Sequence, residues 1–300
     1  MDNKKCGIVS MFGKPNAGKS TLLNLLLKYK LAVTNKKAQT TRNKIAGVLT
    51  EGNTQIIFND TPGILEPEYE LQTFMHSEIT SSVKDADVIL FVADIRKVKI
   101  KDLVKTLSDY KDNLDNKNII IVLTKCDRLS QQEILQKIKE ISSFSEKGID
   151  IVPVSATSGY NIEELKKVII EKLPEGEFLY DEEFLTDRSE RFFVSEIIRE
   201  KILTMFHEEI PYSVFVDIIE FKERDDNKDY INAEIIVERE PQKIIIIGSK
   251  GASLKRLGES SRIAIERFLG RKVYLELFVK VRKGWRENKD FIRNNMGNKN

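Results

Sequence analysis

The residues most able to do chemistry lie at positions 13–20, which read GKPNAGKS and fit the pattern G-x-x-x-x-G-K-[ST]. Glycines at these spacings let successive backbone N–H groups face one anion, and a helix that starts there adds the positive end of its dipole. A lysine and a hydroxyl at the end of the pattern suit a nucleotide phosphate chain and its Mg²⁺ ion. We therefore predict that Lys19 reaches the β and γ phosphates and that Ser20 binds the metal. The alternative is a purely structural turn.

Three later motifs each follow an apolar run. Residues 60–63 (DTPG) offer a carboxylate to the magnesium shell and a glycine amide to a γ phosphate. Residues 124–127 (TKCD) place Asp127 where its carboxylate can accept the N1–H and amino hydrogens of guanine, a donor pair that adenine lacks. Residues 155–157 (SAT) offer backbone N–H groups to the guanine carbonyl. Each motif alone is weak because Asp-rich turns are common, but their order along the chain predicts a guanine-nucleotide site.

A polar stretch at residues 39–42 (QTTR) lies between the first two motifs. One of its threonine hydroxyls would complete the magnesium sphere and order this segment only when a γ phosphate is bound. We favour Thr41 for this role, with Thr40 as the alternative. The residue after DTPG is Ile64, whose hydrocarbon side chain cannot align an attacking water, so we expect slow intrinsic hydrolysis. Arg42 stays open as a source of compensating charge.

These motifs need a framework that brings distant loops together. From residue 6 to about residue 173, short β-branched runs alternate with amphipathic helical stretches. Strands buried on both faces read as unbroken apolar runs, so this pattern predicts a doubly wound, mostly parallel α/β sheet with helices on both faces. Such sheets bind ligands beyond the carboxyl ends of their strands, where the motifs are expected to meet. We assign this domain to residues 1–174.

The remaining sequence predicts a smaller α+β domain. We expect a linker at residues 175–191, the second domain at residues 192–284 and a C-terminal tail at residues 285–300. The tail is rich in Asn and charge, so we expect it to fray from about Lys289. For Trp285 we favour packing over the sheet edge rather than stacking on a base.

Positive charge is concentrated in residues 241–300, which carry 15 basic and 5 acidic side chains. Such a block indicates a polyanion partner, and a solvated charged surface is the alternative. Within it, residues 248–251 (GSKG) resemble the GxxG loop of KH domains, which clamps about four nucleotides of single-stranded RNA. Residues 243–247 (KIIII) have strand propensity, but the KH arrangement predicts a short helix, with Ile246 and Ile247 stacking under bases. A dimerisation domain with a glycine turn is the structural alternative.

Composition narrows the class of protein. With 41% hydrophobic and 32% charged residues, the chain is expected to fold into soluble domains. No run approaches the roughly 18 to 20 apolar residues that span a bilayer. The two cysteines, Cys6 and Cys126, are too few for a disulfide framework or a zinc cluster. We therefore expect a cytoplasmic protein rather than a secreted or membrane-spanning one.

The order of the motifs resembles the translation-factor-related class of GTPases. TKCD departs from the commoner form, in which Asn is usual at the position of Thr124. One hydroxyl can make fewer of the hydrogen bonds that hold the loop than an amide can. We still expect the site to prefer guanine, because the carboxylate of Asp127 is present. With the KH-like block, the chain resembles the bacterial Era GTPases over nearly its whole length, including KAQTTRN, TDRSERF, EIPYSV and IIGSKGASLKRLG. The fold implied is a P-loop GTPase domain followed by a KH domain of type II.

This resemblance also implies a function and partners. It implies a switch protein that hydrolyses GTP to GDP and phosphate with Mg²⁺, binds the 3′ end of 16S rRNA and assists maturation of the 30S ribosomal subunit. It further implies peripheral membrane association, and we expect a monomer. In related GTPases a phosphate-loop Asn can hold K⁺ against the phosphates, so we hypothesise that Asn16 makes turnover faster in K⁺; alternatively, it only stabilises its own loop. The competing interpretations are a GTPase switch with a protein or membrane partner, and a passive RNA-binding protein with a vestigial nucleotide pocket.

The candidate site residues follow from these motifs and the resemblance. We assign catalytic roles to Lys19, Thr41 and Gly63, and metal binding to Ser20, Thr41 and Asp60. Nucleotide contacts are expected from Gly13, Lys14, Pro15, Asn16, Ala17, Gly18, Lys19, Ser20, Thr21, Asp60, Thr61, Pro62, Gly63, Ile64, Thr124, Lys125, Asp127, Ser155 and Ala156. RNA contacts are expected from Ile247, Gly248, Ser249, Lys250, Gly251, Lys255 and Arg256.

Overall fold

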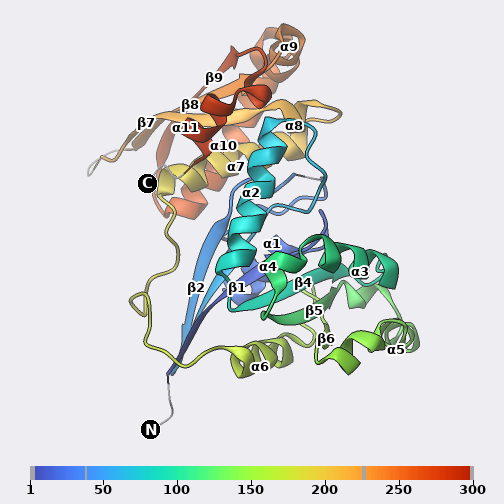
Figure 1. The fold of residues 1–300 in the computed structure, drawn as a ribbon. Coiled ribbons are helices and arrows are strands. Elements are labelled where there is room, and N and C mark those ends of the chain that lie inside the picture. Colours follow the sequence, from blue (N-terminus) through green and yellow to red (C-terminus); the bar gives the residue numbers. More distant parts are fainter. Residues whose placement is uncertain (1–3, 38, 225–227, 298–300) are drawn as a thin grey trace. The chain divides into compact units, whose positions relative to one another are not determined.

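The computed structural model describes residues 4–37, 39–224 and 228–297. Contacts between residues divide the chain into two compact units, Met1–Glu66 with Met75–Asp187 and Pro67–Phe74 with Arg188–Asn300. In Figure 1 the first unit is mostly blue to green and the second mostly yellow to red. No helix among the described residues is long and apolar enough to cross a bilayer.

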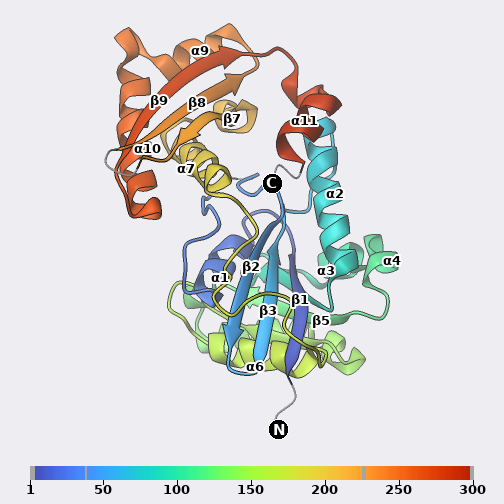
Figure 2. The same cartoon turned by 90° about the vertical axis from the view of Figure 1, so that its left-hand side faces the viewer.

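The first unit is built around a six-stranded sheet with the strand order β2-β3-β1-β4-β5-β6. β2 is antiparallel to β3, and every other neighbouring pair is parallel. Figure 2 shows β2, β3 and β1 side by side in this sheet. The strands are β1 (Lys5–Phe12), β2 (Ile45–Glu51), β3 (Thr54–Asp60), β4 (Val88–Asp94), β5 (Asn118–Thr124) and β6 (Asp150–Pro153).

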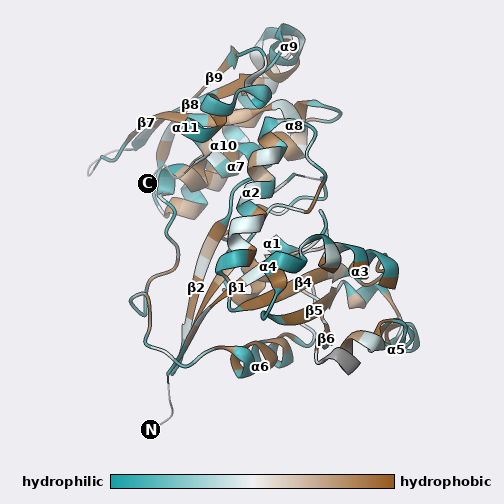
Figure 3. Cartoon of the chain, in the orientation of Figure 1, coloured by the Kyte–Doolittle hydropathy of each residue, from teal (hydrophilic) through white to brown (hydrophobic). Residues whose placement is uncertain are grey.

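Helices cover both faces of this sheet. They are α1 (Lys19–Leu26), α2 (Glu70–Asp85), α3 (Ile100–Asp109), α4 (Lys111–Leu114), α5 (Gln131–Glu140) and α6 (Ile162–Lys172), with 3-10 helices at Cys126–Arg128 and Ser142–Lys147. Right-handed crossovers place α1 on one face and α2, α3 and α5 on the other. On the second face, Ile79 of α2 and Leu103 of α3 are buried against Phe12 and Phe91. Figure 3 shows apolar residues concentrated in the strands between these layers. The predicted doubly wound sheet is confirmed.

One strand of the sheet was not predicted. β2 joins β3 through a hairpin whose turn contains Gly52, with a φ of +58° that favours glycine. The signal that could have found it is the apolar run at residues 45–49 followed by a Gly-Asn turn and a second strand.

The segment predicted as a linker is bound along the first unit as far as residue 187. Gln55 is fully buried in β3, and its Oε1 accepts hydrogen bonds from the N–H groups of Leu179 and Tyr180 at 2.8 and 3.0 Å. Its Nε2 donates to Tyr180 O at 2.8 Å. The rings of Tyr180 and Phe184 stack with centroids 4.5 Å apart. One side chain thus fixes a segment more than 120 residues away in sequence.

The second unit contains a three-stranded sheet in the order β7-β8-β9, with β7 antiparallel and β9 parallel to β8. The elements are α7 (Glu190–Met205), α8 (Ile210–Ser213), β7 (Phe215–Lys222), β8 (Asp229–Val237), α9 (Glu240–Ile247), a 3-10 helix (Ser249–Gly251), α10 (Ala252–Leu269), β9 (Val273–Val281), a 3-10 helix (Trp285–Glu287) and α11 (Lys289–Met296). Ile198 of α7 and Ile265 of α10 pack on Ile235 of β8 in one core. The sequence DDNK at residues 225–228 predicts a charged turn, which lies mostly outside the described residues.

Three expectations for this unit have different outcomes. The helix predicted despite strand propensity is confirmed as α9, which begins with Pro241 in its first turn, where a missing N–H is harmless. The prediction of a frayed end from Lys289 is wrong for residues 289–296, because Phe291 and Ile292 bury an apolar face of α11. Trp285 is packed as predicted, fully buried with its Nε1 donating to Ser213 O at 3.0 Å.

Candidate functional site

The phosphate loop lies between β1 and α1. Gly13 has a φ of +155°, and a Cβ there would lie 2.1 Å from Val92 O, so only glycine fits. Lys19 is 6% exposed, and its Nζ donates to the carbonyl oxygens of Gly13 (3.0 Å) and Lys14 (3.3 Å). Burial lowers the pKa of Lys19 to about 8, against the opposing influence of Asp60. A buried ammonium bonded to neutral carbonyl groups is suited to receive phosphate oxygens.

Three oxygen-bearing side chains meet beside Lys19. Ser20 Oγ lies 2.6 Å from Asp60 Oδ2 and 2.9 Å from Thr41 Oγ1, and Thr41 Oγ1 lies 3.2 Å from the same Oδ2. Asp60 is fully buried, and its Oδ1 accepts no hydrogen bond from any described residue. Burial raises the pKa of Asp60, and Lys19 is the largest opposing influence. Two hydroxyls and a carboxylate with a spare oxygen form the hard ligand set that Mg²⁺ prefers, so these residues fit the ion.

The two threonines of residues 39–42 face different partners. Thr40 Oγ1 donates to Lys37 O at 2.6 Å, so the geometry favours Thr41 as the metal ligand. Arg42 is 2% exposed and is not among the residues that line the cavity in front of Lys19. Over the described ranges, no group of three or more His, Cys, Asp or Glu side chains could hold a metal ion.

The DTPG motif is held tightly on the phosphate loop. A Cβ at Gly63 would lie 2.7 Å from three atoms of Pro15, two of them backbone. The next residue, Ile64, donates its backbone N–H to Gly13 O at 3.1 Å. Thr61 Oγ1 donates to a β1 carbonyl at 2.6 Å. The glycine of this motif is therefore fixed beside the loop predicted to hold the phosphates.

The carboxylate predicted to read guanine is positioned from the SAT loop. Ser155 is fully buried, and its Oγ donates to Asp127 Oδ1 at 2.7 Å. The backbone N–H of Ser158 donates to Ser155 Oγ at 3.2 Å, which fixes the hydroxyl in turn. Asp127 Oδ2 lies 3.1 Å from Arg128 Nε, a side chain that is 64% exposed. Asp127 is thus oriented by a buried bond and keeps one edge near solvent.

The same base-recognition loop is tied to the phosphate loop. Lys125 has a left-handed backbone with a φ of +62°, and its Nζ donates to Asn16 O at 2.6 Å and to Asp94 Oδ2 at 3.0 Å. Arg96 donates to Asp94 Oδ2 at 2.7 Å. Burial alone would raise the pKa of Asp94, but hydrogen bonds from Arg96 and Lys125 outweigh it and lower that pKa to about 2. Sequence reasoning missed Asp94, although a carboxylate that ends an apolar run was a usable signal.

Part of the predicted set lines a cavity of about 260 Å³. Its lining comprises Pro15, Asn16, Gly18, Lys19, Ser20, Thr21, Val33, Thr34, Asn35, Lys36, Lys37, Gln39, Thr40, Thr41, Gly63, Lys97 and Lys125. Asp60 is not part of that lining, but it bonds to Ser20 and Thr41, which are. Asp127, Ser155 and Ala156 are also outside the lining, and they connect to it through the loop of Lys125. The structure therefore gathers the phosphate and metal groups in one cavity, with the base-recognition groups beside it.

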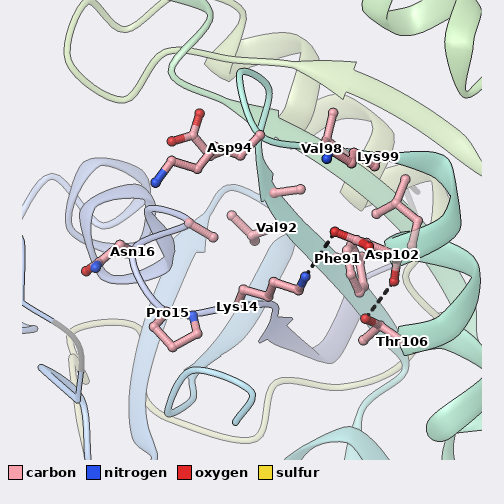
Figure 4. A pocket seen from close by; sticks show the side chains of 14 residues that line it. Lys14, Pro15, Asn16, Phe91, Val92, Asp94, Val98, Lys99, Asp102 and Thr106 are labelled. Carbon is pink, nitrogen blue, oxygen red and sulfur yellow. Dashed lines mark hydrogen bonds and ion pairs between the residues drawn. The ribbon is translucent and has the colours of Figure 1, made fainter.

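A second cavity of about 300 Å³ also borders the phosphate loop and lies against the end of β4 and the start of α3. Figure 4 shows Lys14 directed across it toward Asp102, with Nζ and Oδ2 3.2 Å apart. The nucleotide contact predicted for Lys14 would therefore be made by its backbone.

The GSKG loop of the second unit joins α9 to α10. Gly248 has a φ of +72°, and a Cβ there would lie 2.6 Å from Ser253 Cβ. Lys250 and Gly251 also have positive φ values, of +48° and +79°. The chain thus makes a tight turn in which Lys250 is exposed at the start of an 18-residue helix. Within the described part of the chain, neither Lys250 nor its neighbours Lys255 and Arg256 form an ion pair.

The isoleucines before this loop do not all face solvent. Ile246 is fully buried in the core, so the expectation that it stacks under bases is wrong. Ile247 is half-buried, whereas Ile244 and Ile245 are 67% and 49% exposed. The apolar surface beside the loop is therefore formed by residues two positions earlier than predicted.

Comparisons with known proteins agree with this geometry. Residues 8–125 match the family described as "50S ribosome-binding GTPase", and residues 209–286 match the KH domain family. The GTPase Era of Caldanaerobacter subterraneus is 42% identical over 96% of both chains. "GTPase ERA-like, chloroplastic" of Oryza sativa is 40% identical over 97% of this chain and 69% of its own length.

Solved structures of Era show the same architecture. One, in complex with MgGDPNP and nucleotides 1506–1542 of 16S ribosomal RNA, has a TM-score of 0.92 and 43% identity, covering 97% of this chain and 98% of that one. Another, of an Aquifex aeolicus Era variant bound to GDP and AlF4⁻, has a TM-score of 0.91 and 42% identity, covering 96% of this chain and 98% of that one. The similarity of sequence and fold along both units shows that this chain belongs to the Era family of GTPases.

Proposed function

We propose that this protein is a guanine-nucleotide switch that hydrolyses GTP and binds the 3′ end of 16S rRNA during maturation of the 30S ribosomal subunit. The observation that carries the proposal is the meeting of Ser20, Thr41 and Asp60 beside the Lys19 ammonium, with the three oxygens 2.6 to 3.2 Å apart. The Era structure solved with MgGDPNP and 16S rRNA nucleotides supports both ligands.

In the proposed nucleotide site, the amides of the phosphate loop and Lys19 bind the β and γ phosphates. Ser20, Thr41 and Asp60 would hold Mg²⁺, and a bound Mg²⁺ supplies charge neutralisation at the phosphate oxygens. Thr41 lies on a segment without regular structure between α1 and β2 and contacts Ser20 and Asp60, and the metal and the γ phosphate would hold it in that place. The Gly63 amide and Thr41 are therefore the two groups that distinguish GTP from GDP.

A monovalent cation could assist hydrolysis at this site by adding positive charge near the phosphates. Ile64 cannot orient water, and Asn16 lines the cavity next to Lys19. We propose that Asn16 helps hold K⁺ against the phosphates, where the ion would add positive charge beside that of the lysines. Turnover should be faster in K⁺ than in Na⁺ at equal ionic strength, and Asn16→Ala should remove the difference. Equal wild-type rates in the two salts would eliminate this part of the proposal.

Guanine is proposed to be read by Asp127, whose carboxylate accepts the N1–H and amino hydrogens of the base. The Ser155 hydroxyl fixes that carboxylate from one side, and this leaves Oδ2 free to turn toward the base once the exposed Arg128 side chain moves aside. An exposed ion pair of this kind contributes at most about 1 kcal/mol, so it does not prevent binding.

RNA is proposed to bind at the GSKG loop. Lys250, Lys255 and Arg256 are exposed in a tight turn and the following helix, where backbone N–H groups and side-chain charges can approach phosphates together. Ile244 and Ile245 present an exposed apolar surface on the preceding helix, suited to unstacked bases. Affinity carried by such phosphate contacts falls as salt concentration rises.

The test uses two matched glycine variants. Gly251 and Gly270 lie at opposite ends of α10, with φ values of +79° and +71° and open space around both. Gly251→Asp and Gly270→Asp therefore add the same charge and the same backbone strain. Binding of a 16S rRNA 3′-end fragment, with a GTP analogue bound, should be lost in Gly251→Asp and kept in Gly270→Asp. Equal affinities would favour the alternative of a protein or membrane partner.

We also propose a cytoplasmic, monomeric protein with peripheral membrane association. Size-exclusion chromatography with light scattering tests the monomer, and sedimentation with anionic vesicles tests the association. Vesicle binding that survives Gly251→Asp would separate the membrane contact from the RNA contact.

A further inference from the structure

We propose that the open face of the sheet in the second unit binds an arginine-rich segment of a partner protein. The rings of Tyr274 and Phe278 would stack on guanidinium groups, and carboxylates between and beside the rings would receive their N–H groups. This surface includes neither the nucleotide cavity nor the GSKG loop, so the proposal goes beyond the proposed function and stands or falls separately from it.

The two faces of this sheet differ in what they contact. Strands β7, β8 and β9 lie side by side (Figure 2), and Ile231, Ala233 and Ile235 of β8 face the buried core that α7, α9 and α10 complete. The alternate residues of the three strands point the other way, and we call the surface they form the outer face. Pairing sets them in four rows: Lys222, Tyr230 and Tyr274; Glu220, Asn232 and Glu276; Asp217, Glu234 and Phe278; and Phe215, Ile236 and Lys280.

One end of the outer face is covered and the other is open. At the covered end, the rings of Trp285 and Phe291 lie 5.9 and 5.4 Å from the ring of Phe215. At the open end, Tyr274 and Phe278 are each 53% exposed. Aromatic side chains are enriched where proteins bind one another, so the open end has the composition of an interaction surface.

The charge of the outer face favours a cationic partner. Its carboxylates outnumber its ammonium groups, with Asp217, Glu220, Glu234 and Glu276 against Lys222 and Lys280. Glu276 is held in place, because the Tyr230 hydroxyl donates to its Oε2 at 2.7 Å and the Tyr274 hydroxyl to its Oε1 at 3.3 Å. Each carboxylate oxygen has a second lone pair for a further donor. Such a surface repels phosphate groups and attracts lysine and arginine side chains.

This chain already places one guanidinium on the outer face. Arg224 Cζ lies 5.7 Å from the ring centroid of Tyr230, and the rings of Tyr230 and Tyr274 stack with centroids 6.1 Å apart. A guanidinium is planar, so it can stack on a ring and donate paired N–H groups to a carboxylate at the same time, which an ammonium cannot do. Arginine is therefore the side chain that fits this combination of rings and acids.

The spacing of the exposed rings defines the kind of segment. Tyr274 and Phe278 are four residues apart in β9, which corresponds to about 13 Å at roughly 3.3 Å per strand residue, and Glu276 lies midway between them. An extended peptide has the same rise. Arginines at every fourth position could therefore place one guanidinium on each ring with the carboxylate between them.

The experiment measures peptide binding to the intact protein by fluorescence anisotropy at low and high salt. The probe is the labelled peptide GRGSGRGSGRG, compared with versions that carry lysine or citrulline at the arginine positions. The variants are Tyr274→Ala, Phe278→Ala, their double variant and Glu276→Gln. The matched controls are Tyr160→Ala, because Tyr160 is 55% exposed in the first unit, and Glu259→Gln, because Glu259 is exposed on α10.

The expected results depend on both rings and charge. The arginine peptide should bind, with affinity that falls as salt rises. Tyr274→Ala and Phe278→Ala should each weaken binding about two- to fivefold, and the double variant about five- to twentyfold. Glu276→Gln should weaken it about two- to threefold. The lysine peptide should bind at least about twofold more weakly than the arginine peptide, and the citrulline peptide should not bind. Both controls should bind as wild type does.

Several outcomes would overturn the inference. One is an arginine peptide that does not bind, or that binds the double variant as tightly as wild type. Another is loss of affinity for a 16S rRNA 3′-end fragment in the double variant, which would show that the rings stack on bases. A third is self-association of wild type that Phe278→Ala abolishes in light scattering, which would assign the outer face to a second copy of this chain. Thermal unfolding checks the fold of each variant, and equal binding of the arginine and citrulline peptides by wild type would reject the proposal without any variant.

Discussion

Gly63→Ala should displace the DTPG segment and slow GTP hydrolysis, and nucleotide should still bind. The added Cβ would lie 2.7 Å from Pro15 N, Cα and Cγ, and ordinary contacts begin near 3.4 Å. Two of these atoms are backbone, so the segment must retreat by about 0.7 Å. That retreat would lengthen the Ile64 N to Gly13 O hydrogen bond from 3.1 Å to about 3.8 Å, beyond hydrogen-bonding distance.

The expected consequence is slower hydrolysis with nearly unchanged binding of GDP. A displacement approaching 1 Å at a reacting centre can lower a rate by about a hundredfold, whereas Lys19, Ser20 and Asp127 are untouched by the substitution. Single-turnover hydrolysis of preloaded GTP measures the first quantity, and fluorescence titration with a GDP analogue measures the second.

Gly176→Ala is the matched control, because Gly176 has no neighbour within 4 Å and no positive φ. It should behave as wild type in both assays. Hydrolysis by Gly63→Ala within twofold of wild type would refute the reasoning, since it would mean that the close contact with Pro15 has no role in catalysis.

Three further predictions follow from single side chains. Asp127→Asn should lose GTP affinity by at least about thirtyfold and gain affinity for XTP, whose base offers the complementary groups; unchanged GTP affinity in competition assays would contradict it. Burial lowers the pKa of Lys19 from 10.5 to about 8, so the unfolded chain binds more protons between those pH values. The free energy of unfolding of ligand-free wild type should therefore rise from pH 8 to 10.5 relative to Lys19→Met, by up to about 3 kcal/mol in urea denaturation, and a flat difference would argue against it. Gln55→Leu strands the N–H groups of Leu179 and Tyr180 and should lower that free energy by about 2–4 kcal/mol, whereas no loss would mean that residues 175–187 detach freely.

The phosphate loop and the strand-end motifs could be predicted because their chemistry is local. Each depends on a few consecutive residues at a strand end, and the doubly wound pattern indicates which ends converge. The choice between Thr40 and Thr41 was open at that level. It depends on the neighbouring carbonyl of Lys37, which binds the Thr40 hydroxyl and leaves Thr41 facing Asp60.

Contacts between distant segments could not be predicted from patterns. Gln55 binds Leu179 and Tyr180 across more than 120 residues, and nothing in the local sequence marks a glutamine in a strand as an anchor. The same holds for α11. Its short apolar face does not by itself predict an ordered helix, and the contact of Phe291 with Phe215 of β7 that buries this face is not visible in the local sequence.

An acidic segment precedes the basic block in the sequence, and part of its charge is used within the second unit. Residues 175–240 carry 20 acidic and 8 basic side chains. Asp229 lies 2.5 Å from Arg271 Nε, and Glu238 lies 2.5 Å from Arg286. Part of the acidic charge therefore neutralises arginines of the basic block within the second unit. The lysine of the GSKG loop, Lys250, and the nearby Lys255 and Arg256 are exposed positive charges.

The most direct test of the central claim is displacement of a fluorescent GDP analogue from the intact protein, in Mg²⁺, by increasing GTP or ATP. Ser20, Thr41 and Asp60 would bind the metal of either triphosphate, so discrimination reports the Asp127 carboxylate joined to that same cavity. GTP should displace the analogue at concentrations at least about a hundredfold lower than ATP. Displacement by both nucleotides at similar concentrations would contradict a guanine-specific site.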